Sequence, residues 1–150
     1  MKYYLDCEFN GFGGHLMTMG IAAEDGRNLY LIYNTRSTDP WVQKNVGPLI
    51  YDVPIEPHVD IIGNANANGP AHIAAFMNQD YNINIITDWP DDIRYFCQSI
   101  ITGPGQMTAL PSFSMHVLRV DAYPTTLKGA IQHNAMWDAL ALKHYCEFCR

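Results

Sequence analysis

Acidic side chains occur in this sequence at positions where they could bind a metal ion. Asp6 and Glu8 lie two residues apart within residues 2–9, where the side chains alternate in character. Such alternation predicts a strand, so both carboxylates leave the same face, about 7 Å apart at roughly 3.3 Å per residue. Hard cations such as Mg²⁺ prefer carboxylate oxygens, so the two residues could share an ion. A strand with a solvated outer face would explain the same pair.

A second acidic group follows a predicted buried strand. Asp92 lies at the start of a predicted helix, where side chains gather above the ends of sheet strands. Asp88 and Asp91 are competitors for the same role. Asp88 could instead cap the helix, and Asp91 is expected to face solvent. Because the helix macrodipole favours acids in a first turn whatever their function, the choice among the three stays open.

His133 and Asp138 form the third group, at the start of the last predicted helix. Five residues correspond to about 140° around a helix of 3.6 residues per turn, so the two cannot share one helix face. One interpretation places Asp138 on the inward face and His133 on the preceding loop. The alternative makes His133 a helix-start residue and Asp138 an exposed acid.

The elements expected to position these residues form a mixed α/β sheet with packed helices. An antiparallel meander of three strands is predicted first, with Asp25-Gly26 as a hairpin turn. Its strands are residues 2–9, about 15–24 and 29–33. A short helix is expected from Pro40, capped by Asp39, and residues 51–70 are expected to be loop. The remaining predicted elements are helix 71–78, strand 84–87, helix 90–101, irregular chain 103–111, strand 115–120 and an amphipathic helix 134–149.

Length and composition narrow the classes of protein. A chain of 150 residues fits one domain, residues 1–150, and 48% hydrophobic residues indicate a folded protein. The formal charge of -6 argues against nucleic-acid binding through a broad basic surface, but not against a nuclease whose cations supply positive charge. The four scattered cysteines indicate free thiols. No apolar run reaches the roughly 20 residues of a membrane span, so a cytoplasmic location and no membrane partner are expected.

The order and spacing of these groups resemble a known family. Asp6-Cys7-Glu8, Asp92 followed by Tyr95-Phe96, and His133-x-x-x-x-Asp138 resemble the three motifs of the DEDDh branch of the ribonuclease H-like 3′–5′ exonucleases. That family usually has Asn four residues before the acid of its second motif, where this chain has Asp88. Further segments resemble the small bacterial and phage exoribonucleases of the RNase AS type. They are residues 23–27, 41–48, 92–98 and 107–111.

The resemblance implies a fold, a cofactor and a reaction. The fold is a ribonuclease H-like mixed sheet, in which parallel strands follow the antiparallel three-stranded meander, with helices on both faces. Two Mg²⁺ or Mn²⁺ ions would be held by the four carboxylates of Asp6, Glu8, Asp92 and Asp138, with His133 as general base. The substrate would be single-stranded RNA, adenylated ends included, and the product nucleoside 5′-monophosphates. The resemblance also implies a homodimer.

Three matters stay open at this level. Phe9 could stack on a terminal base, although strand alternation alone makes it a core aromatic. A 3′–5′ exonuclease that prefers single-stranded DNA or very short oligonucleotides is one alternative function. The other is a catalytically inactive nucleic-acid-binding module on the same fold.

Overall fold

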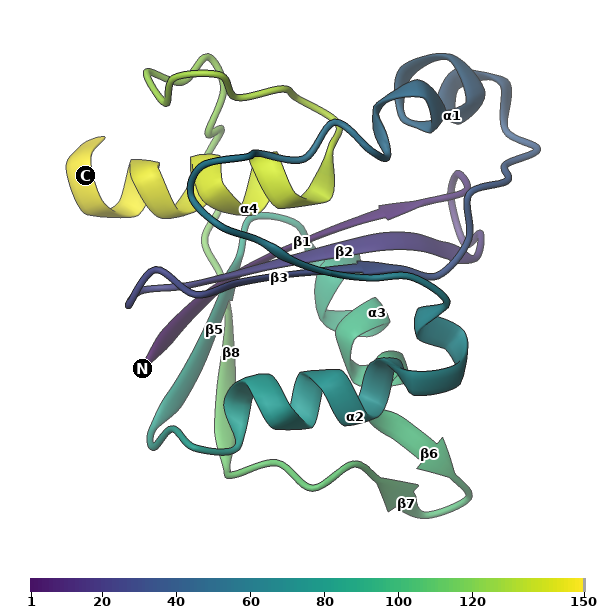
Figure 1. Ribbon diagram of the computed structural model, residues 1–150, viewed down its shortest axis with the longest axis vertical. Coiled ribbons are helices and arrows are strands. Elements are labelled where there is room, and N and C mark those ends of the chain that lie inside the picture. The colour runs from purple at the N-terminus through teal and green to yellow at the C-terminus, as the bar shows by residue number, and fades with distance from the viewer. Residues whose placement is uncertain (150) are drawn as a thin grey trace.

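A mixed sheet of six strands forms the centre of the computed structural model, which describes residues 1–149 (Figure 1). Its strands are β1 (Lys2–Phe9), β2 (Leu16–Ala23), β3 (Asn28–Ile32), β4 (Asp60–Ile62), β5 (Ile83–Thr87) and β8 (Phe113–Val117). They lie in the order β4-β3-β2-β1-β5-β8, and β2 alone of the six runs opposite to the others. The predicted meander followed by parallel strands is therefore confirmed.

Helices cover both faces of the sheet, as predicted (Figure 1). Helices α1 (Pro40–Asn45) and α4 (Ala135–His144) lie on one face, and α2 (Ala65–Met77) and α3 (Pro90–Ile100) on the other. The alternation of β1 matches this arrangement. Tyr3, Leu5 and Cys7 enter the core under α2 and α3, whereas Tyr4 packs into the core under α4. Asp6 and Glu8 therefore share the α4 face of β1.

The predicted hairpin turn and the predicted helix cap are both found in the structure. Gly26 has a φ of 96°, which the turn between β2 and β3 requires and glycine adopts without strain. The Asp39 side chain accepts a hydrogen bond from the Val42 N–H at 2.9 Å and so caps α1, with Pro40 at the first helical position. A 3₁₀ turn, Gly47–Leu49, follows α1.

The prediction of a loop over residues 51–70 is wrong in its second half. Strand β4 lies at the sheet edge, and α2 begins at Ala65 rather than at residue 71. Local propensity indicates a turn here because Asn and Gly favour turns. Tertiary packing overrides that preference, since Ala65 is fully buried and Gly69 lies against the Tyr33 ring. Residues 103–107, predicted irregular, belong to a hairpin of β6 (Ile101–Gly103) and β7 (Gln106–Met107), and Ile101, predicted as the last helical residue, begins β6.

The last helix also differs from its prediction. Helix α4 ends at His144 and continues as a π-helical turn, Tyr145–Cys149. The helix is buried on nearly all sides rather than amphipathic. One side packs on β1 and β2, and the other is covered by earlier parts of the chain, including residues 49–52. In the region the structure covers, no helix combines the length and apolar character needed to cross a bilayer. Cys7, Cys97 and Cys149 are free cysteines.

Candidate metal centre

The first group of carboxylates lies where β1 and β5 run side by side. Oxygens of Asp6, Asp88 and Asp92 lie within 4.8 Å of one another. Asp92 is 1% exposed and is fixed from two sides, because it accepts hydrogen bonds from the Cys7 N–H, at 3.2 Å, and from the Thr87 hydroxyl. Three elements, β1, the β5–α3 loop and α3, therefore meet at one point.

The structure distinguishes the three acids around the second motif. Asp88 joins Asp6 and Asp92, so it is an additional member of the group rather than a replacement. The expectation that Asp88 could cap α3 is wrong, since the N-cap residue is Trp89. Asp91 points elsewhere: it pairs with Arg94 at 3.3 Å and accepts a hydrogen bond from the Trp89 indole at 3.2 Å.

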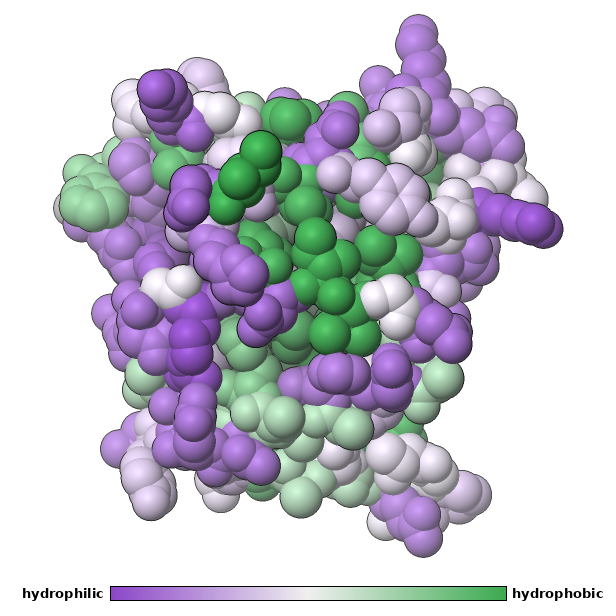
Figure 2. Space-filling view, in the orientation of Figure 1, coloured by the Kyte–Doolittle hydropathy of each residue, from purple (hydrophilic) through white to green (hydrophobic). Residues whose placement is uncertain are grey.

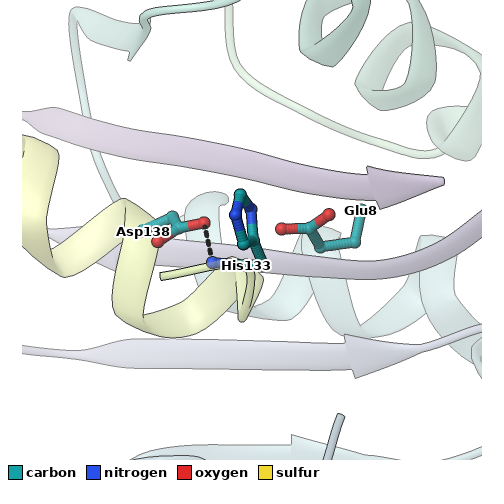
Figure 3. Close-up of side chains that lie close together, drawn as sticks. All are labelled: Glu8, His133 and Asp138. Atoms are coloured by element: carbon teal, nitrogen blue, oxygen red, sulfur yellow. Dashed lines mark hydrogen bonds between the residues drawn. The ribbon is translucent and has the colours of Figure 1, made fainter. Parts of the chain in front are cut away.

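The second group joins β1 to the start of α4. Ligand atoms of Glu8, His133 and Asp138 lie within 4.8 Å of one another. Figure 3 shows the His133 ring between the two carboxylates in that view. His133 lies on the loop before α4, as one interpretation predicted, with its N–H donating to Asp138 Oδ2 at 3.0 Å and a φ of 69°. Asn134 caps the helix by accepting from the N–H groups of Met136 and Trp137.

Without a cation, the charged forms of the carboxylates in both groups are disfavoured, which raises their pKa values. Burial, followed by the charge of Asp92, raises the pKa of Asp6 well above its usual range. Burial and then Asp138 act in the same direction on the pKa of Glu8. Burial raises the pKa of Asp92 to about 8 and that of Asp138 to about 7. A divalent cation would remove this penalty, because it favours the charged forms.

Two unpartnered oxygens show that the site fits a metal. Asp6 Oδ2 and Asp138 Oδ1 are buried and accept no hydrogen bond from residues 1–149. Buried polar atoms are rarely left without a partner, and a carboxylate oxygen without one is a natural ligand for a hard cation. The acidic groups can therefore hold a metal ion.

Two residues next to the site could not be identified from the sequence. Tyr123 lies beside Asp138, and burial together with that carboxylate raises the pKa of its phenol. Gly20 pairs with Asp6 across the β1–β2 ladder, and a Cβ there would lie 2.3 Å from the Ala135 carbonyl oxygen. The glycine lets the first turn of α4 lie directly on the sheet, which brings Asp138 to Asp6.

An open groove of about 460 Å³ adjoins the second group. Aromatic side chains line it beside Glu8: Phe9, Phe12, Trp41 and Trp89. Phe9 stacks on Tyr95 with ring centroids 4.7 Å apart and packs against the core, which confirms its place as a core aromatic. It also lines the groove, and its stacking on a terminal base stays a prediction. Phe12 is 99% exposed and has no protein surface to cover it.

A larger cavity, about 700 Å³, lies beside β4 and α2. Apolar side chains gather near the centre of the face seen in Figure 2, and Ile61 is an exposed residue of the cavity lining. None of the acids grouped at the carboxylate site lines this cavity. The smaller groove is the one that reaches the carboxylate site, because Glu8 of the second group lines it.

No protein-family model matches this chain. No curated protein matches it either.

Proposed function

We propose that this protein is a Mg²⁺- or Mn²⁺-dependent 3′–5′ exonuclease with a ribonuclease H-like fold, which releases nucleoside 5′-monophosphates from single-stranded RNA. One observation carries the proposal: Asp6, Glu8, Asp92 and Asp138 come from three distant segments and form two electrostatically coupled acidic groups, the second of which includes His133. One of these acids is buried and three are partly buried, and structural acids rarely gather in this way without cationic partners, so a functional reason is needed.

The residues divide between two cation positions. Asp6, Asp88 and Asp92 would hold one ion, and Glu8 with Asp138 the other. Bound divalent cations would neutralise the phosphodiester charge and polarise its phosphorus–oxygen bonds. This dependence also reconciles a net charge of -6 with a polyanionic substrate, because the protein alone would repel phosphate.

In this proposal His133 acts as the general base. Burial lowers the pKa of its imidazole, so the ring is neutral near pH 7 and can accept a proton. It takes that proton from the water whose oxygen bonds to phosphorus. The bond from phosphorus to the 3′ oxygen of the preceding nucleotide then breaks, that oxygen takes a proton from solvent to become the new 3′ hydroxyl, and the terminal nucleotide leaves as a 5′-monophosphate.

The aromatic groove supports a single-stranded end as the substrate. Phe12, Trp41 and Trp89 are about half exposed or more, an unusual state for large aromatic side chains. Unpaired bases stack on such surfaces with little regard to sequence, and each stacking contact is worth about 1 to 3 kcal/mol. A duplex end could not insert its base without unpairing it.

The direct test is the length of 5′-labelled oligomers incubated with Mn²⁺. The proposal predicts stepwise shortening from the 3′ end, 5′-monophosphates as products, and preference for RNA when unlabelled RNA and DNA compete. Equal competition by both would contradict the RNA preference and leave the exonuclease proposal standing. No shortening, with RNA still bound, would contradict the exonuclease proposal and indicate an inactive binding module.

A further inference from the structure

The position of the His133 backbone is fixed, but its ring is not held by hydrogen bonds. The backbone N–H donates to Asp138 Oδ2, in a left-handed conformation that few residues other than glycine adopt. Within residues 1–149, no hydrogen bond reaches the imidazole nitrogens from another side chain or from the backbone. The ring instead meets Trp41 in a T-shaped contact, with centroids 5.0 Å apart and planes 83° apart.

One end of the segment that carries Trp41 is fastened to β1. The Asn10 side chain accepts from the N–H groups of Thr38 and Asp39, at 2.9 and 3.0 Å, and donates to the Thr38 hydroxyl at 3.0 Å. Asn10 follows Glu8 by two residues, so these bonds tie the start of α1 to the strand end that carries that carboxylate.

The other end of the segment is fastened to α4. Asn134 donates from its side chain to the Leu49 carbonyl at 2.8 Å, and the Trp137 indole donates to the Asp52 carbonyl at 2.9 Å. Val42 is buried in the core shared with α4. Residues 38–52 thus span the two elements that carry the second carboxylate group, and Trp41 lies between the two attachments.

We infer that Trp41 is a positioning residue, whose ring holds the His133 imidazole in the orientation that proton transfer needs. This inference rests on the proposed function. Trp41 is 54% exposed, so the core does not account for its presence, and its ring contact with His133 gives the side chain a specific role. A base must be aimed at its proton, and a small misplacement costs rate rather than binding.

The kinetic test separates positioning from base stacking. Replacing Trp41 with Ala should lower kcat by roughly 10- to 100-fold, the range for a misplaced catalytic group. Trp41→Phe keeps an aromatic ring at the contact and should retain most of the turnover that Trp41→Ala loses. Phe12→Ala is the matched comparison, because Phe12 lines the same groove but makes no ring contact with His133. It should raise KM and leave kcat within about threefold, because stacking contributes to binding.

A second readout needs neither activity nor metal. In the metal-free protein, NMR signals of the His133 ring protons, assigned with His133→Ala, should carry the ring-current shift of Trp41. Trp41→Ala should move and broaden them, whereas Phe12→Ala and Tyr51→Ala should not; Tyr51 is an exposed aromatic that does not line the groove.

The outcomes separate this inference from the proposed function. Unchanged His133 signals in Trp41→Ala would overturn the positioning role, and so would a raised KM with unchanged kcat. If the wild type hydrolyses no oligomer, the proposed function fails, and the NMR result still decides whether Trp41 orders the ring.

Discussion

Gly20 lies against Ala135 so closely that even one added methyl group would overlap the helix backbone. A Cβ on Gly20 would be 2.3 Å from the Ala135 carbonyl oxygen and 2.7 Å from the Met136 Cα. Backbone atoms cannot yield as the end of a flexible side chain can, so α4 would have to move. Because α4 carries Asp138, the packing of this glycine sets the geometry of the carboxylate site.

Gly20→Ala should therefore affect both stability and activity. Overpacking of this kind costs about 1 to 3 kcal/mol, so the melting temperature should fall by several degrees. Metal affinity and turnover should fall with it. Gly63→Ala is the control, since a Cβ there would meet no atom within 4 Å and Gly63 has no positive φ. Equal melting temperatures for the two variants would contradict this account of the packing.

Asp88 and Asp91 provide a matched pair of substitutions, three residues apart. Asp88→Asn should weaken Mn²⁺ binding measured by calorimetry, because Asp88 lies with Asp6 and Asp92. Asp91→Asn should leave the Mn²⁺ affinity within about twofold of the wild-type value. The ion pair with Arg94 that it breaks is partly exposed, and such pairs contribute little to stability. A larger loss of affinity in Asp91→Asn than in Asp88→Asn would reverse the assignment.

The stability of the metal-free protein should depend on pH through Asp92. Its pKa is raised from 3.8 to about 8 in the folded state, so folding favours the protonated form. The stabilisation is complete below the unfolded pKa and is lost as the pH rises through the folded value. The melting temperature should fall between about pH 4 and about pH 8, and saturating Mg²⁺ should oppose that fall by binding the charged form.

The control for this pH dependence is Asp92→Asn, which has no proton to release at that position. Its metal-free melting temperature should vary less over the same interval. A wild-type curve that rises toward high pH, or one parallel to that of the variant, would show that burial of Asp92 does not govern stability.

His133→Ala should separate binding from turnover. Loss of a general base costs on the order of 10²-fold or more, so kcat should fall by that amount. Metal affinity should change little, since the carboxylates remain. Near wild-type turnover would refute the assignment of His133 as the base.

The positions of Asp6, Glu8 and His133 could be predicted because local rules govern them. Alternation along β1 places the two acids on one face, and Asn134 marks the start of α4, which leaves His133 on the loop. The part played by Asp88 could not be predicted, because its proximity to Asp6 depends on the parallel pairing of β1 with β5.

Long-range packing explains the remaining differences. The Asn and Gly residues at the start of α2 locally favour a turn, and only the burial of Ala65 and Gly69 explains why this segment is helical. The roles of Gly20 and Trp41 depend on contacts with residues more than 90 positions away, Ala135 and His133. No periodicity in the sequence encodes such contacts.

The most direct test of the central claim is the binding of Mn²⁺ to the metal-free protein, counted by calorimetry and examined by electron paramagnetic resonance. Two neighbouring ions per chain are predicted, with a spectrum showing spin coupling between them, and Asp6→Asn should abolish the coupled signal. Absence of binding, or binding that Asp6→Asn leaves unchanged, would contradict the claim that these carboxylates form a metal centre.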